Sequence, residues 1–215
     1  MTADEVNIEI SAEDISRIPF EAGAKMPADS NALSAIRTAL RIRGIGMNLF
    51  VSGASAPERE AAVIDAYKEI NGNMDRLIIE SNPIPSRLFG IADTSKSGSG
   101  ISALIKQNGS LADSAGGAIV LNAEDLLEEE LSWKLLKRML RSGRVEIGAD
   151  GGVSNKPFKL QVYPLPQTEM DLKVIILGNE SHFDHFYNSD EDFRELFQFF
   201  AEFDTVIELD EDTLK

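Results

Sequence analysis

Residues 116–127, with the sequence GGAIVLNAEDLL, constrain the fold more than any other stretch of the chain. A run of apolar residues after two glycines predicts a fully buried central strand, and the polar residues that follow would lie at the carboxyl edge of a sheet. Ligands bind at that edge in open α/β sheets. The sequence therefore raises the question whether Asn122, Glu124 and Asp125 still take part in chemistry.

Strand and helix patterns alternate along the rest of the chain, which predicts an α/β fold with a parallel central sheet and helices on both faces. Further strands are expected at 47–51, 76–80, 172–177 and 205–209, and a β-hairpin insertion at 144–163. Helices are expected at about 31–43, after Ser55, near 101–107, near Leu126, at 128–141 and at 181–200, whereas 81–100 has the composition of a loop.

Domain boundaries follow from composition. Residues 1–27 are polar and predict an N-terminal arm or linker. The short alternation at Val6, Ile8 and Ile10 is either an edge strand or no regular element. Residues 28–209 predict one α/β domain, and an apolar content of 43% is enough for a sizeable core. Residues 210–215 form an acidic tail or a truncation point.

Charge and cysteine content exclude several classes of function. The 21 Lys and Arg residues against 36 Asp and Glu residues give a net charge of −15, which would repel the phosphate backbone of a nucleic acid. Without cysteine, the chain has neither disulfides nor a thiol nucleophile. No stretch approaches the roughly 18 apolar residues of a membrane span. A soluble cytoplasmic protein, bound to neither nucleic acid nor membrane, is expected.

The loop after the 47–51 strand is the first candidate site. A phosphate-binding loop needs G-x-x-x-x-G-K-[ST], whose glycines and lysine approach phosphate and whose hydroxyl holds Mg²⁺. In that register the chain keeps Gly53, but it has Glu58 for the second glycine, Arg59 for the lysine and Glu60 for the hydroxyl. Two carboxylates beside a triphosphate would be repulsive. The substitutions favour a structural turn from strand to helix over ATP binding.

The end of the opening stretch is the second candidate. Folds of this kind place an Asp that binds Mg²⁺ and a Glu that activates water there. Asn122 has no charge and Ala123 has no polar group, while Glu124 and Asp125 come one or two positions late. We interpret these two acids as caps of a helix that begins near Leu126.

Two further positions have alternative interpretations. Asn179 follows the 172–177 strand, where it is either a residue that orients a γ-phosphate and the attacking water or an ordinary turn residue. Arg194 is either an arginine finger that reaches a neighbouring subunit or a partner of its acidic neighbours, and the second interpretation is favoured. His182, Asp184 and His185 suggest a metal cluster at first sight, but ordinary packing is the preferred interpretation.

A long ordered string of residues resembles the AAA+ module of Lon-like ATP-dependent proteases. Residues 109–127 resemble the pattern G-x-L-x-x-A-N-G-G-Y-L-V-L-x-A-x-D-L-L, and residues 132–147 contain a similar W-x-x-L-K-R-x-L-R-x-G. Segments 32–50, 172–178 and 192–204 also resemble segments of the family and occur in the same order along the chain. The resemblance implies the large AAA+ subdomain of the P-loop type.

The resemblance also implies roles for the candidate residues. Gly53 to Glu60 would be the Walker A position, Leu121 to Ala123 the Walker B position, Asn179 the sensor-1 position and Arg194 the finger. The lysine, the hydroxyl and the Walker B acids of the family are replaced, so ATPase activity does not follow. The chain also lacks room for the family's helical insertion between residues 79 and 109, and 94–101 carries no aromatic residue for gripping a substrate.

The function expected from these features is a nucleotide-independent scaffold of a Lon-like protease. It would assemble into a homo-oligomeric ring and position protein substrates for a peptidase domain outside the chain. Neither a cofactor nor a metal is expected, and Gly53, Arg59, Glu60, Asn122, Asn179 and Arg194 would form a vestigial nucleotide site. One alternative is an ATPase motor that uses ATP and Mg²⁺, with Arg59 replacing the lysine and Glu124 or Asp125 replacing the Walker B acids. The other is a stand-alone interaction module.

Overall fold

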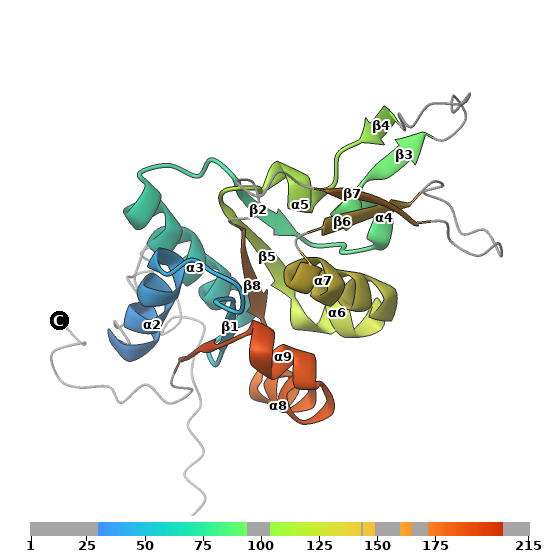
Figure 1. Ribbon diagram of the computed structural model, residues 1–215. Helices are drawn as coiled ribbons and strands as arrows, with labels where there is room; N and C mark the ends of the chain where they lie inside the picture. The colour runs from blue at the N-terminus through green and yellow to red at the C-terminus, as the bar shows by residue number, and fades with distance from the viewer. Residues whose placement is uncertain (1–29, 94–103, 143, 149–159, 165–171, 204–215) are drawn as a thin grey trace, which may run out of the picture.

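A five-stranded parallel sheet forms the centre of the molecule in the computed structural model, which describes residues 30–93, 104–142, 144–148, 160–164 and 172–203. The strand order is β2-β5-β8-β1-β9 (Figure 1). The strands are β1 (Leu49–Ser52), β2 (Leu77–Glu80), β5 (Ala118–Asn122), β8 (Lys173–Leu177) and β9 (Phe199–Glu202). The predicted strand of the opening stretch is confirmed as β5, a central strand between β2 and β8.

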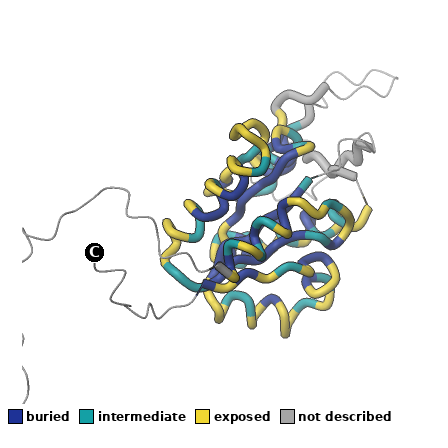
Figure 2. Tube along the Cα trace, turned by 90° about the vertical axis from the view of Figure 1, so that its left-hand side faces the viewer, coloured by how far each residue is buried: buried dark blue, intermediate teal, exposed yellow. Residues whose placement is uncertain are grey.

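Helices cover both faces of this sheet, as the sequence predicts. One face packs against α2 (Ser30–Arg41) and α3 (Ala56–Asn71). The other face packs against α4 (Pro85–Phe89), α5 (Ser110–Asp113), α6 (Ala123–Glu128), α7 (Glu130–Ser142), α8 (Glu180–Ser189) and α9 (Glu191–Leu196). Figure 2 shows the buried strands between helices whose outer sides are exposed.

The alternation of side chains along the strands divides the core into two clusters. In β1, Leu49 and Val51 face α2 and α3, whereas Phe50 faces the other side. Burial of apolar residues on both faces of a strand produces the continuous apolar runs seen in β1, β5 and β8. The continuous runs at these three strands therefore reflect a sheet covered on both sides.

A smaller four-stranded sheet, with the order β4-β3-β6-β7, extends from one end of the domain (Figure 1). Its strands are β3 (Ile91–Asp93), β4 (Leu104–Gln107), β6 (Arg144–Gly148) and β7 (Leu160–Pro164). The predicted hairpin is confirmed, because β6 and β7 pair in antiparallel register from Arg144 opposite Pro164 to Gly148 opposite Leu160.

Two predictions about segments near this small sheet are wrong. The region expected to be a loop contains α4 and β3, since Pro85 starts a short helix and the β3 backbone pairs with β4 and β6. Residues 104–107 form a strand, not a helix, because they pair with β3. The helix expected near Leu126 is confirmed as α6, although it begins three residues earlier, at Ala123, with Asn122 as the N-cap residue.

The helical region expected over 181–200 is confirmed as far as Leu196, with a break at Asp190, and is wrong over its last four residues. Asp190 separates α8 from α9, and the chain becomes strand β9 at Phe199. From 197 to 203 the residues alternate between more buried positions (Phe197, Phe199, Ala201, Phe203) and exposed ones (Gln198, Phe200, Glu202). This period of two is the strand signal that the preceding helical spacing obscured. The strand expected at 205–209, the arm at 1–27 and the tail at 210–215 lie outside the described residues.

Candidate functional site

The carboxyl ends of the central strands surround a cavity of about 440 Å³ beside the first turn of α3. This is the edge at which the sequence predicts a site. Of the predicted residues, Arg59, Glu60 and Asn122 line the cavity together, whereas Gly53, Asn179 and Arg194 do not. The remaining lining residues are Ala56, Pro57, Ala61, Ile64, Ile79, Glu80, Ser81, Val120, Leu121, Asp125 and Leu177.

Arg59 is bonded to the loop that precedes it. Its Nη1 donates hydrogen bonds of 2.8 Å to the carbonyl oxygens of both Gly53 and Ala54. Gly53 and Ala54 have positive φ angles of 71° and 47°, and a non-glycine residue adopts such a backbone only when its surroundings hold it. The Arg59 side chain therefore fastens the turn between β1 and α3 internally. Burial lowers the pKa of Arg59.

The N-terminus of α3 is also occupied by the chain's own groups. Ser55 is the N-cap residue, and its backbone N–H donates a hydrogen bond of 2.8 Å to the Glu58 carboxylate. This bond lowers the pKa of Glu58, and Pro57 has no N–H to offer. A helix N-terminus binds phosphate through free N–H groups and its positive dipole end. In this chain the Glu58 carboxylate lies at that helix end, and its negative charge would repel a phosphate group.

Asn122 acts as a helix cap at the end of β5. Its side-chain oxygen accepts a hydrogen bond of 3.4 Å from the Glu124 N–H, and Ala123 is buried directly behind it. Glu124 and Asp125 lie in the first turn of α6, where carboxylates favour the positive end of the helix dipole. The sequence predicts that Glu124 and Asp125 cap this helix, but the capping side chain is that of Asn122.

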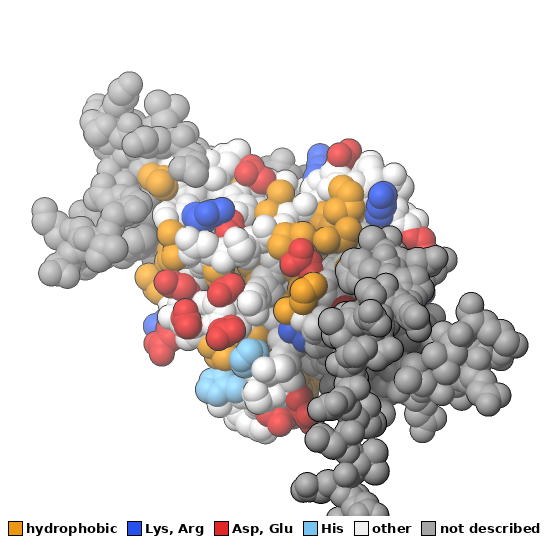
Figure 3. Space-filling view, turned by 180° about the vertical axis from the view of Figure 1, so that it is seen from behind, with side chains coloured by type: hydrophobic (Ala, Val, Ile, Leu, Met, Phe, Trp, Pro, Cys, Tyr) orange, Lys and Arg blue, Asp and Glu red, His pale blue; other side chains and the backbone are white. Residues whose placement is uncertain are grey.

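Asn179 is likewise a cap, at the N-terminus of α8. Its Oδ1 accepts hydrogen bonds of 2.8 Å from the His182 N–H and from the Ser181 hydroxyl. Both histidines lie at the surface, as Figure 3 shows. Among the described residues no group of three or more metal-binding side chains is arranged to hold a metal ion.

Arg194, in α9, contacts Tyr187 of α8 and Glu191 of its own helix. Its Nη1 donates to the Tyr187 carbonyl oxygen, its guanidinium lies 5.6 Å from the centre of the Tyr187 ring, and its Nη2 is 3.9 Å from the exposed Glu191 carboxylate. These contacts fit the preferred interpretation, in which Arg194 pairs with an acidic neighbour.

Glu80 is a site residue that the sequence interpretation missed. Its side chain is 3% exposed, and its carboxylate accepts hydrogen bonds from the Ser110 hydroxyl and the Asn82 N–H and lies 3.2 Å from the Arg87 Nε. A carboxylate at such burial needs partners, which α4 and α5 supply. The available signal was an acidic residue closing the apolar run of residues 77–79.

Asp125 provides a pH-dependent test of the cavity. Burial raises its pKa above the ordinary value of 3.8, and the nearby Glu124 and Glu128 raise it further. A raised pKa means that the folded state binds more protons than the unfolded state, so stability falls as the pH rises through the raised pKa. Asp125→Asn should therefore raise Tm at pH 7 and have little effect below pH 3.8. Calorimetric scans across this range check it, and an equal effect at every pH would contradict it.

The fold and the edge site together define an α/β domain with a parallel central sheet, a cavity at the carboxyl ends of its strands, and a β1–α3 turn that is hydrogen-bonded by Arg59. The sequence profile described as "LonB-like, AAA domain" matches residues 73–204, more than half of the 215 residues. The chain therefore belongs to the LonB-like AAA domain family, as the resemblance to Lon-like proteases predicts. No curated protein matches the chain.

Similar solved structures include three of NtrX from Brucella abortus. One has a TM-score of 0.49 and 14% identity over 81% of this chain and 37% of NtrX. NtrX with ADP has a TM-score of 0.49 and 16% identity over 84% and 36%. NtrX with ATP has a TM-score of 0.47 and 13% identity over 88% and 40%. This chain thus spans well under half of the NtrX chains. Within the described part, no helix is long and apolar enough to cross a membrane.

Proposed function

We propose that this chain is a nucleotide-independent AAA domain that helps to assemble a ring and positions protein substrates for a peptidase domain outside the chain. The observation that carries the proposal is the pair of hydrogen bonds from Arg59 to the carbonyl oxygens of Gly53 and Ala54. The residue at the position of the phosphate-binding lysine is used to hold the loop, and Glu58 adds negative charge at the helix end. These contacts support a structural role for the loop.

Isothermal titration with ATP and Mg²⁺ tests the nucleotide-independent part. The chain should bind ATP with a Kd weaker than about 1 mM, which corresponds to a binding free energy of less than about 4 kcal/mol. The reason is that Arg59 is hydrogen-bonded to the loop and Glu58 adds negative charge there. The variant Glu58→Gly/Arg59→Lys/Glu60→Thr, which places the phosphate-loop residue types at the same positions, should bind more tightly and serves as the positive control. Micromolar Mg²⁺-dependent binding by the unmodified chain would overturn the proposal.

The ATPase alternative makes an opposite demand on Arg59. If Arg59 neutralised phosphate, the Arg59→Ala variant would abolish measurable ATP turnover while the unmodified chain hydrolysed ATP. The scaffold proposal expects no ATP turnover in either protein.

Light scattering tests the proposed contribution to ring assembly. A chain that contributes to a ring should form oligomers at high concentration or with its peptidase partner.

A further inference from the structure

Among the described residues, the outer edge of β9 is an unpaired edge of the central sheet. β9 comes last in the strand order, and no strand of the described ranges pairs with its outer side. On the inner side, the Phe199 N–H donates to the Asn48 carbonyl oxygen at 3.2 Å and the Phe203 N–H to the Ser52 carbonyl oxygen at 3.0 Å. Successive residues of a strand direct their backbone groups to opposite sides, so the N–H groups of Phe200 and Glu202 point outward. Such a row of backbone groups is a template for another strand.

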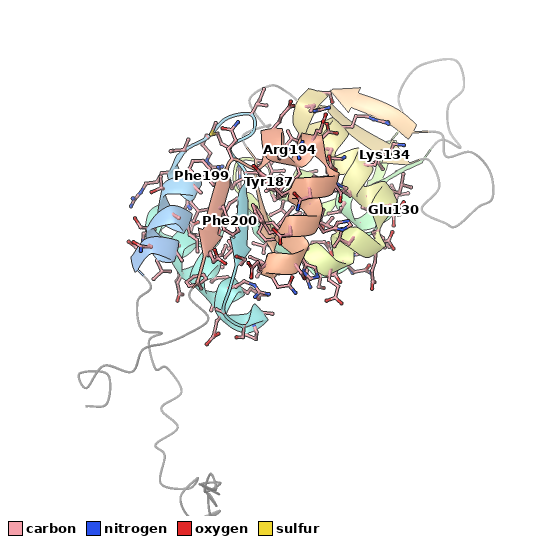
Figure 4. All side chains as sticks on the ribbon, turned by 90° about the horizontal axis from the view of Figure 1, so that it is seen from below. Glu130, Lys134, Tyr187, Arg194, Phe199 and Phe200 are labelled. Carbon is pink, nitrogen blue, oxygen red and sulfur yellow. The ribbon has the colours of Figure 1, made fainter. Side chains whose placement is uncertain are left out.

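An aromatic row lies beside this edge. The Phe200 side chain is 39% exposed, and its ring centre lies 4.2 Å from that of Phe183. Phe183 in turn stacks on Tyr187, which is 47% exposed, at 5.5 Å. Figure 4 shows Phe200 on β9 and Tyr187 on the neighbouring helix α8. An added strand with apolar side chains on one face would cover exposed aromatic surface as well as free backbone groups.

We propose that residues 6–10 of this chain add to the outer edge of β9 as a sixth strand. Their sequence, VNIEI, alternates apolar and polar residues, which is the pattern of a half-covered strand. Val6, Ile8 and Ile10 then cover the aromatic row of Phe200, Phe183 and Tyr187, and Asn7 and Glu9 face the other side. Residues 11–29 connect this segment to α2 and span about 60 Å when extended, so the connection reaches β9 without constraint.

Residues 205–209 are the competing segment within the chain. They follow β9 closely, so a two-residue turn back along it would use Asp204 and Thr205 and leave only residues 206–209 for the returning strand. Tight hairpin turns of that length require positive φ angles and favour Asn-Gly or Gly at these positions. Thr205 is β-branched and no glycine is present, which makes residues 6–10 the better occupant.

Residue-resolved amide exchange by NMR tests the proposal with an internal control in one strand. In the full chain, the outward N–H groups of Phe200 and Glu202 should exchange slowly, like the inward ones of Phe199 and Phe203. The variant Ile8→Asp/Ile10→Asp should speed exchange at Phe200 and Glu202 by about tenfold or more and leave Phe199 and Phe203 unchanged. Ile18→Asp, a matched apolar-to-acidic change in the same arm, should have no effect.

Three outcomes overturn the proposal. Fast exchange at Phe200 and Glu202 in the unmodified chain would mean that the edge is open. Slow exchange that survives Ile8→Asp/Ile10→Asp would mean that another segment covers it, with residues 205–209 the first to examine. Protection that disappears on dilution would identify a second copy of the chain as the occupant.

Discussion

Replacing Phe50 with alanine is expected to lower the free energy of unfolding by about 3–5 kcal/mol. Phe50 is fully buried at the centre of an aromatic cluster, with ring centres of Phe183, Phe186 and Phe193 5.4, 6.4 and 5.9 Å away. Removing this ring leaves a cavity under β1 that neighbouring side chains on rigid elements cannot fill completely. Urea unfolding should show a lower midpoint with an unchanged slope.

Phe200→Ala is the matched control for this measurement. Phe200 belongs to the same cluster, 6.3 Å from Phe50, but it is 39% exposed. Both truncations are compared in the Ile8→Asp/Ile10→Asp background, in which the proposed strand does not cover Phe200. There the Phe200 truncation should cost less than about 2 kcal/mol, because less apolar surface leaves water when this ring packs. Equal losses for the two variants would contradict the assignment of Phe50 to the centre of the core.

Replacing Gly53 with alanine is expected to cost about 3 kcal/mol or more. Gly53 has a φ of 71°, and a Cβ atom there would lie 1.9 Å from the Phe203 carbonyl oxygen and 2.8 Å from the Phe203 nitrogen. The overlap is with backbone at the end of β9, so no flexible side chain can move aside. The loss should appear in urea unfolding and in the Tm.

Gly72→Ala separates the overlap from the cost of a positive φ. Gly72 has a similar φ of 75°, but a Cβ atom there would meet nothing within 4 Å. Only the backbone term remains, about 1 kcal/mol. If Gly53→Ala were no more harmful than Gly72→Ala, the contact with Phe203 would be wrong. The expected difference would show that packing against the Phe203 backbone requires glycine at position 53, without any role for phosphate.

The sequence predicts the elements whose signal is local and strong. β1, β5 and β8 carry continuous apolar runs, and α3 begins after a Ser cap with Pro57 in its first turn and ends at Gly72. α4, β3 and β4 were missed because each is at most five residues long and the strands are defined by pairing with distant segments. β9 was missed because its alternation follows directly on a helical pattern.

The candidate site was predictable in residue type but not in orientation. The departure from the pattern G-x-x-x-x-G-K-[ST] is visible in Glu58, Arg59 and Glu60. The sequence does not reveal that Arg59 turns back onto Gly53 and Ala54, since that depends on the backbone of the turn. Glu80 was missed because its partners Arg87 and Ser110 come from α4 and α5, which the sequence did not predict.

The internal fastening by Arg59 has a thermodynamic consequence on the proposed function. A ligand that binds only the folded state adds about 2.7 kcal/mol of stability at a concentration 100 times its Kd. The Arg59 guanidinium belongs to the same chain as the loop that it holds, so its effective concentration is fixed. The stability that it adds therefore does not depend on the concentration of any ligand in solution. The folded population of this domain, and any assembly built on it, would then be uncoupled from the supply of nucleotide in the cell.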